Sequence, residues 1–131
     1  MTVVDTSALA AVVFGEDDAE RYVDALQRAE SLVVSAVTLV ESRIVIEARQ
    51  GPDATRDLEL LVSEAAIEVV PVDVAQADAA FAAWLRFGKG RHPAGLNLGD
   101  CFAHALSTTL DEPLLFKGAD FAATDVRAAL A

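Results

Sequence analysis

Four short apolar runs alternate with helical segments, and this order constrains the fold more than any other feature of the chain. Helical spacing of apolar residues and stop signals such as Gly51-Pro52 separate the runs. Strands that alternate with helices indicate a mainly parallel sheet covered on both faces. The predicted strands cover residues 2–4, 31–35, 66–72 and 113–116, and the predicted helices cover 7–14, 17–30, 36–50, 53–65, 73–88 and 100–112.

Length and residue usage narrow the class of protein. A chain of 131 residues with 53% hydrophobic residues suits one globular domain. Cys101 is the one cysteine, so no intramolecular disulfide forms, and His92 and His104 are too few to build a zinc site alone. No apolar stretch approaches the roughly 20 residues of a membrane span, and the first residues lack the pattern of a signal peptide. We therefore expect a cytoplasmic protein without a membrane partner.

The formal net charge of −11 argues against broad electrostatic attraction to nucleic acid or to anionic membranes. Residues 79–99 differ from the rest of the chain in charge, because they contain no Asp or Glu. This interval is either a solvated loop region or a local site for a polyanion. Its candidate RNA-binding residues are Arg86, Lys89, Arg91 and His92.

Glu41 lies within the apolar stripe of the predicted helix 36–50, and we expect this stripe to face the core. A buried carboxylate costs several kcal/mol unless it is paired, protonated or bound to a cation. Two interpretations remain open, an ion pair with an arginine such as Arg43 and a place in a functional site. The stripe consists of Val37, Val40, Ile44, Val45 and Ala48.

Three aspartates stand where a parallel sheet binds ligands or where a helix begins. Asp5 follows the first strand, and Asp120 lies just beyond the last strand. Asp100 opens a predicted helix, where an acid also serves as a cap; turn chemistry is the corresponding alternative for Asp120. If these residues and Glu41 converge, their repulsion favours a divalent cation, and oxygen ligands fit Mg²⁺ or Mn²⁺ better than zinc.

Four segments of the chain resemble those of PIN-domain ribonucleases, and more narrowly the VapC toxins of VapBC toxin–antitoxin pairs. The segments read "VVDTSAL", "ESRIVIEAR", "LNLGDCFAHALS" and "PLLFKGADFAATDV" and span nearly the whole chain. The resemblance implies a single PIN domain over residues 1–131. It also implies a three-layer α/β/α sandwich around a central parallel sheet of four or five strands.

The resemblance further implies an endoribonuclease in which a metal-activated water hydrolyses RNA phosphodiester bonds in a four-carboxylate cleft. The implied cofactor is Mg²⁺ or Mn²⁺, with Asp5 and Asp100 as metal ligands and Thr6 as a supporting hydroxyl. The implied catalytic acids are Asp5, Glu41, Asp100 and Asp120. Many family members carry Thr or Ser and then Asn or Asp before the final "DF", whereas this chain reads "FKGADF". Asp125 is therefore a rival for the role of Asp120.

The implied partners are an RNA substrate, a VapB-type antitoxin and a second copy of the chain. The abundance of apolar residues on short helices such as 7–14 and 22–29 also favours a homodimer, without locating its interface. One alternative is a catalytically weak PIN domain that binds RNA or protein without cutting. A phosphatase with an aspartate nucleophile is disfavoured, because that chemistry needs an acid where Ser7 stands. For His104 we favour a packing or hydrogen-bonding role, and for Cys101 a packing role.

Overall fold

A four-stranded parallel sheet forms the centre of the computed structural model, which describes residues 1–130. The strand order is β3-β2-β1-β4, so β1 lies between β2 and β4, and both neighbours run parallel to it. The predicted parallel α/β fold is confirmed, with four strands. Their bounds are Thr2–Val4 for β1, Leu32–Ser35 for β2, Ile67–Val70 for β3 and Leu114–Leu115 for β4.

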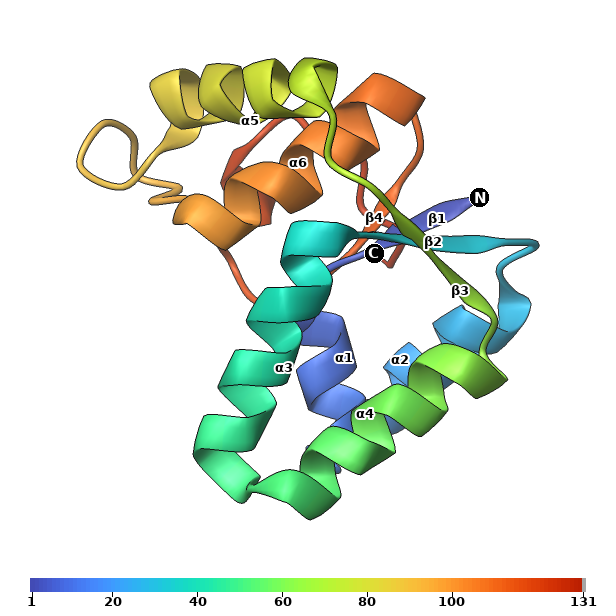
Figure 1. The fold of residues 1–131 in the computed structure, drawn as a ribbon. Coiled ribbons are helices and arrows are strands. Elements are labelled where there is room, and N and C mark those ends of the chain that lie inside the picture. The colour runs from blue at the N-terminus through green and yellow to red at the C-terminus, as the bar shows by residue number, and fades with distance from the viewer. Residues whose placement is uncertain (131) are drawn as a thin grey trace.

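Helices cover both faces of this sheet, as the sequence predicted. Figure 1 shows α5 and α6 on one face and α1 to α4 on the other, which gives three layers. Within the described residues, no helix is both long enough and apolar enough to cross a membrane. The helices are α1 (Thr6–Val13), α2 (Ala19–Arg28), α3 (Ala36–Gln50), α4 (Pro52–Glu64), α5 (Val74–Phe87) and α6 (Leu98–Leu110), followed by a short 3-10 helix at Phe121–Ala123.

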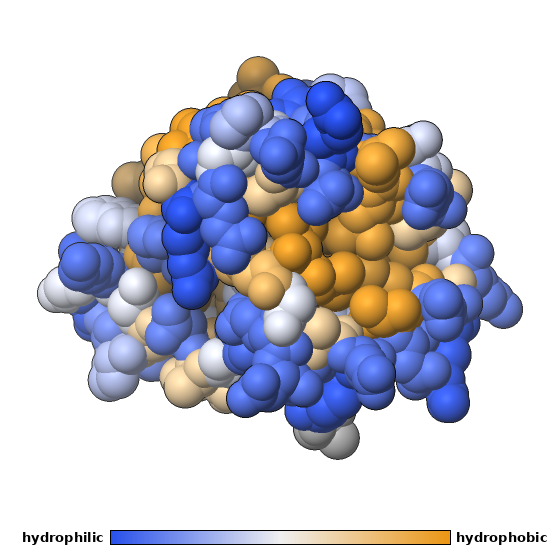
Figure 2. Space-filling view, turned by 90° about the horizontal axis from the view of Figure 1, so that it is seen from below, coloured by the Kyte–Doolittle hydropathy of each residue, from blue (hydrophilic) through white to orange (hydrophobic). Residues whose placement is uncertain are grey.

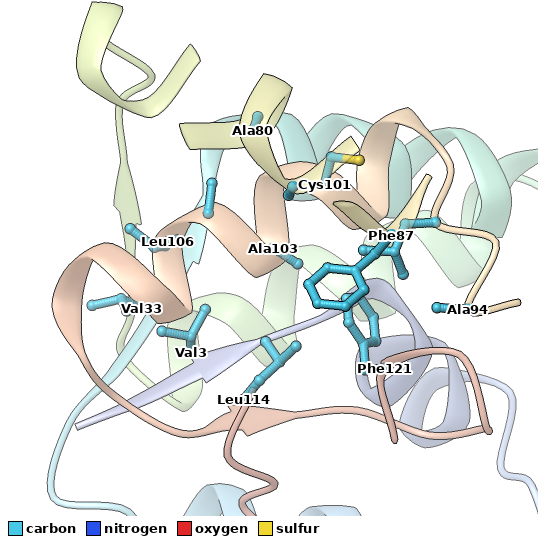
Figure 3. Packing of buried hydrophobic residues seen from close by; sticks show 13 residues of the cluster. Val3, Val33, Ala80, Phe87, Ala94, Cys101, Ala103, Leu106, Leu114 and Phe121 are labelled. Atoms are coloured by element: carbon cyan, nitrogen blue, oxygen red, sulfur yellow. The ribbon is translucent and has the colours of Figure 1, made fainter. Parts of the chain in front are cut away.

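The core has two halves because successive side chains of a strand point to opposite faces of the sheet. Val3 of β1 belongs to the cluster beneath α5 and α6, whereas the next residue, Val4, belongs to the cluster shared with α1, α2 and α4. Figure 3 shows the first cluster, in which side chains from the sheet, from α5 and α6 and from Phe121 gather in one place. Strands β1, β2 and β4 are therefore largely buried on both faces, which explains why they are almost wholly apolar, whereas the edge strand β3 exposes Glu68 and Val69.

Helix α6 begins at Leu98, two residues before the predicted start. Asn97 caps the helix: its side-chain oxygen accepts a hydrogen bond from the backbone N–H of Asp100 at 2.8 Å. The Asp100 carboxylate in turn accepts one from the backbone N–H of Asn97 at 3.0 Å. This reciprocal capping box satisfies two of the free N–H groups at the helix start. Asp100 is thus the third residue of the helix instead of its cap.

The predicted orientation of α3 is wrong. The helix packs against the rest of the molecule through Thr38, Leu39, Ser42 and Ile46, and the predicted core stripe faces outward. Ile44 is 63% exposed and Val40 is 51% exposed. On this inward side, the Ser42 hydroxyl and the backbone carbonyl of Thr38 contact the Thr6 hydroxyl of α1. Figure 2 shows the molecule from the side on which α3 and α4 lie in Figure 1, where hydrophobic residues form a continuous area among hydrophilic ones.

Two leucines of α4 offer a matched test of this core. Leu58 is fully buried between the helix and the sheet, whereas Leu60 is 50% exposed. We expect Leu58→Ala to lower the free energy of unfolding by about 2–5 kcal/mol, because it leaves a cavity. Leu60→Ala should change it by no more than about 0.5 kcal/mol. Urea denaturation of both variants measures the difference, and equal losses would contradict the described packing.

Candidate active site

Asp5 lies at the carboxyl end of the central strand and is almost fully buried. Its backbone N–H donates to the carbonyl of Leu115 at 3.0 Å, which joins it to β4. One carboxylate oxygen, Oδ2, caps α1 by accepting bonds from the backbone N–H of Ser7 at 2.9 Å and from the Ser7 hydroxyl at 2.6 Å. The other oxygen, Oδ1, is buried and has no hydrogen-bond partner in the described part of the chain. Asp5 therefore caps a helix with one oxygen and offers the second to a ligand.

Ser7 contributes to the site although the sequence analysis assigned it no role there. Its hydroxyl donates to Asp5 and accepts a hydrogen bond from the backbone N–H of Lys117 at 2.9 Å. The serine thus links the start of α1 to the segment that follows β4. A hydroxyl residue two positions after a strand-terminal aspartate is the sequence signal that would have identified it.

Glu41 reaches the same region from α3. The Thr6 hydroxyl donates to Glu41 Oε1 at 2.6 Å and lies 3.0 Å from the Ser42 hydroxyl. Among the described residues Glu41 forms no ion pair. Arg43 instead binds Glu59, with 2.6 Å between Nε and Oε1, so the interpretation of Glu41 as an ion-pair partner of Arg43 is wrong.

Gly99 leaves the space that the Glu41 carboxylate occupies. A Cβ atom at position 99 would overlap the carboxylate, so any other residue there would force the Glu41 side chain to move. The close approach of α6 to α3 therefore depends on the absence of a side chain at this position.

The carboxylates influence one another electrostatically. Burial, reinforced by the charge of Glu41, raises the pKa of Asp5 to about 6. Burial also raises the pKa of Asp100 to about 6, with further contributions from Asp5 and Asp120. The pKa of Glu41 is raised by burial and then by the charge of Asp100. Charge therefore links Asp5, Glu41 and Asp100 to one another, and the exposed Asp120 is linked to them through Asp100 alone.

The four predicted acids offer ligand atoms of the kind that a hard divalent cation prefers. All these ligand atoms are carboxylate oxygens, and the unpartnered Oδ1 of Asp5 is a ligand atom in need of a partner. Within residues 1–130, no three Asp, Glu, His or Cys side chains are arranged closely enough to form a complete metal-ligand cluster. Mg²⁺ in proteins is commonly bound by one or two carboxylates together with water and substrate phosphate.

Asp125, the sequence-based rival of Asp120, has other partners. Its carboxylate lies 2.7 Å from Nε2 of His104 and 3.0 Å from a guanidinium nitrogen of Arg86. Burial opposes ionisation of Asp125, but these two partners outweigh it and lower its pKa. Only Asp120 of the two affects the pKa of Asp100.

The four predicted RNA-binding residues have different surroundings. Arg86 is bound to Asp125, and Arg91 lies 5.0 Å from the centre of the Trp84 ring. His92 is partly buried, and its Nδ1 accepts a hydrogen bond from a backbone N–H. Lys89 is exposed beside a cavity that Asn97 and Leu98 also line at the start of α6. Their role in RNA binding stays a prediction.

His104 and Cys101 are both buried in α6. The His104 ring lies 5.5 Å from that of Phe87 and binds Asp125, so it ties the C-terminal segment to α5 and α6. Burial and then the charge of Asp100 raise the pKa of the Cys101 thiol to about 11, which makes it a poor nucleophile. Both positions match the packing roles favoured from the sequence.

The PIN domain family model matches residues 2–127. Ribonuclease VapC30 of Mycobacterium tuberculosis is 48% identical over 124 residues, which are 95% of each chain. The crystal structure of VapC20 from the same species, described as a Sarcin-Ricin loop cleaving toxin, superposes with a TM-score of 0.79 at 18% identity and covers 96% of each chain. A toxin–antitoxin complex from Klebsiella pneumoniae gives a TM-score of 0.72 at 16% identity, covering 95% of this chain and 93% of that one.

The raised pKa of Asp5 predicts a pH-dependent loss of stability. Between the unfolded pKa of 3.8 and the folded pKa of about 6 the folded state holds the extra proton, so stability falls as pH rises through this window. Asp5→Asn removes this penalty and keeps an acceptor for Ser7. In EDTA at about pH 7.5 the variant should be more stable than the parent by up to about 3 kcal/mol, and at about pH 4 the gain should vanish.

Asp73→Asn is the matched control, because Asp73 also caps a helix but is exposed. Urea denaturation of both variants at the two pH values measures the effect. A parent as stable as Asp5→Asn at the higher pH would contradict the described burial of this carboxylate.

Proposed function

The chain belongs to the VapC ribonucleases of the PIN-domain family and is an endoribonuclease toxin, and from this premise we propose how its own residues act. The proposed metal ligands are Asp5 and Asp100, and the ion is Mg²⁺ or Mn²⁺, since VapC ribonucleases generally depend on a metal. The observation that carries the proposal is the buried, unpartnered Oδ1 of Asp5 in the field of other acids. The proposed catalytic acids are Asp5, Glu41, Asp100 and Asp120.

When bound, a divalent cation stabilises charge on the phosphate and lowers the pKa of water. Asp5 and Asp100, with pKa values of about 6, are mostly ionised at neutral pH and can hold such an ion. The pKa of Glu41 is raised, and a hydrogen bond from the Thr6 hydroxyl holds its carboxylate in place. Glu41 is therefore suited to accept a proton from the attacking water. Asp120 at the edge of the site adds negative charge that favours the cation.

RNA is the proposed substrate, and exposed cations near the start of α6 would hold its backbone. Lys89 and Arg91 are exposed and come from the interval without acids. Single-stranded or loop RNA suits such a surface best, because its bases are accessible. Cleavage of RNA would take place in the cytoplasm.

A VapB-type antitoxin is the proposed protein partner. The similar fold of a chain from a toxin–antitoxin complex and the family of this chain support it. An arginine or lysine of the antitoxin could enter the acidic site, because a cation there would satisfy the carboxylates while excluding phosphate. The net charge of −11 favours a partner with basic groups.

A homodimer is the second proposed assembly, and part of the apolar surface of α1 and α2 is already used in the core. Leu9 of α1 and Leu26 of α2 are buried. Several large exposed apolar residues lie on α3 and α5 and at the start of α6. This surface supports pairing because exposed apolar area of this extent usually marks an interface. It includes Val40, Ile44, Val45, Phe81, Trp84, Leu85 and Leu98.

Glu41→Gln tests the proposed activity. Gln keeps the volume and an acceptor for Thr6 but loses the charge and the proton-accepting group, so RNA cleavage should fall by about 100-fold or more. Cleavage by the parent should stop in EDTA and return with Mg²⁺ or Mn²⁺. The control is Glu47→Gln, an exposed acid of the same helix, which should cleave like the parent. A parent that binds RNA without cutting it would support the catalytically weak alternative.

Light scattering tests the homodimer. At micromolar concentration we expect a mass of twice the 13.8 kDa of the chain. Ile44→Glu should shift the mass toward the monomer, since it places a charge on the exposed apolar surface of α3. A parent that stays monomeric would refute the proposed dimer.

A further inference from the structure

Lys117 connects three segments that are far apart in the sequence. It follows β4 by two residues, and its side chain is 32% exposed. Its ammonium group lies 3.0 Å from a carboxylate oxygen of Glu16 and 2.8 Å from one of Asp18, both in the turn between α1 and α2. Its backbone N–H donates to Ser7. The residue therefore joins the segment after β4 to both ends of α1.

The first connection leads to Asp5. The Lys117 backbone and the Asp5 carboxylate are the two partners of the Ser7 hydroxyl, at 2.9 Å and 2.6 Å. Leu115 lies two residues before Lys117, and its carbonyl accepts a hydrogen bond from the backbone N–H of Asp5. Residues 115–117 therefore form one wall around the buried carboxylate. Any displacement of this short segment changes the orientation of Oδ2 and with it that of Oδ1.

The second connection leads to Asp120. Gly118 follows Lys117 with φ of +105° and turns the chain, and Asp120 comes two residues later, close enough to raise the pKa of Asp100. Gly118, Ala119 and Asp120 are all exposed. Buried Phe121 fixes the far end of this turn. The start of the turn is held by Lys117, because its ammonium group bonds Glu16 and Asp18.

Glu16 and Asp18 keep Lys117 in this place. Hydrogen bonds to both carboxylates, first to Asp18 and then to Glu16, raise the pKa of Lys117, so it stays charged at neutral pH. Because its ammonium group is engaged by two acids of the α1–α2 turn, it is held away from the predicted metal ligands. Its role is therefore to hold backbone, and not to contact phosphate.

We propose that Lys117 is a positioning residue, which holds the wall around Asp5 and the turn that carries Asp120 through its ion pairs with Glu16 and Asp18. This inference rests on the proposed function of these acids as the metal site. Groups that orient metal ligands without touching the ion commonly change metal affinity or activity by about 10- to 100-fold when they are removed.

Lys117→Met tests the inference, because Met keeps the backbone N–H and much of the side-chain length but loses the ammonium group. The first readout is hydrogen exchange in metal-free protein. The Ser7 amide is in the first turn of α1 and has no acceptor within the helix, so its protection reports on Asp5. We expect exchange at Ser7 and at position 117 to become about tenfold faster, while amides of α4 stay protected.

The second readout is Mn²⁺ affinity, measured without RNA. Lys117→Met should bind Mn²⁺ about tenfold more weakly or worse, and cleavage should recover in part at high Mn²⁺. The double variant Glu16→Gln/Asp18→Asn should show the same changes, and adding Lys117→Met to it should have little further effect. Lys117→Arg, which restores the charge, should rescue both readouts.

Arg28→Met is the control, since it breaks an exposed ion pair with Asp24 that lies away from these segments. Unchanged Ser7 exchange and unchanged Mn²⁺ affinity in Lys117→Met would overturn the inference, as would equal effects of Arg28→Met. A parent that fails to cleave RNA would overturn the proposed function instead, and the exchange data would still decide the role of Lys117.

Discussion

The burial of the Asp5 carboxylate is the constraint on which the rest of the site depends. A strand in the middle of a parallel sheet delivers this side chain to a position that water hardly reaches. The start of α1 can satisfy only one of its oxygens, and the neighbouring acids make its charge still less favourable. The fold therefore holds a carboxylate in an environment that a cation would relieve. Such local destabilisation persists because the sheet and both core halves around it are fully packed.

Helix α3 shows how this requirement overrides the usual distribution of residues. Thr38 and Ser42 are fully buried, whereas Ile44 on the same helix is largely exposed. The Ser42 hydroxyl and the backbone carbonyl of Thr38 contact the Thr6 hydroxyl, which in turn bonds Glu41 where α1, α3 and α6 meet. Gly99 completes the arrangement by letting α6 approach the Glu41 carboxylate. The apolar side of α3 is left exposed, so the site and the outer surface are two consequences of one helix orientation.

The alternation of apolar runs and helical segments was enough to predict the parallel sheet, its layers and the acids at the strand ends. The orientation of α3 could not be predicted in this way, since its valines follow helical spacing whether they face the core or a partner. Ser7 and Lys117 were missed because their contact joins positions 110 residues apart and exists only after β4 has paired with β1. The pairing of Arg86 with Asp125 likewise depends on how the C-terminal segment packs on α5. Sequence patterns predicted which carboxylates belong to the site. The hydrogen bonds from Ser7 to Asp5 and from Asn97 to Asp100 are local, whereas those from Thr6 to Glu41 and from Lys117 to Ser7 are tertiary and could not be predicted from sequence spacing.

The charge distribution makes the cation central to substrate binding as well as to chemistry. The chain has 10 basic residues against 21 acids, and ion pairs with acids already engage at least five of the basic residues: Arg28, Arg43, Arg86, Lys117 and Arg127. Little positive charge is left to attract a phosphodiester, and the proposed site itself repels one. In the proposed arrangement, a divalent cation between carboxylates and phosphate would reverse this repulsion at the place where the backbone is cut. Metal binding and RNA binding would then be coupled at this site, and the exposed Lys89 and Arg91 would hold the RNA backbone beside it.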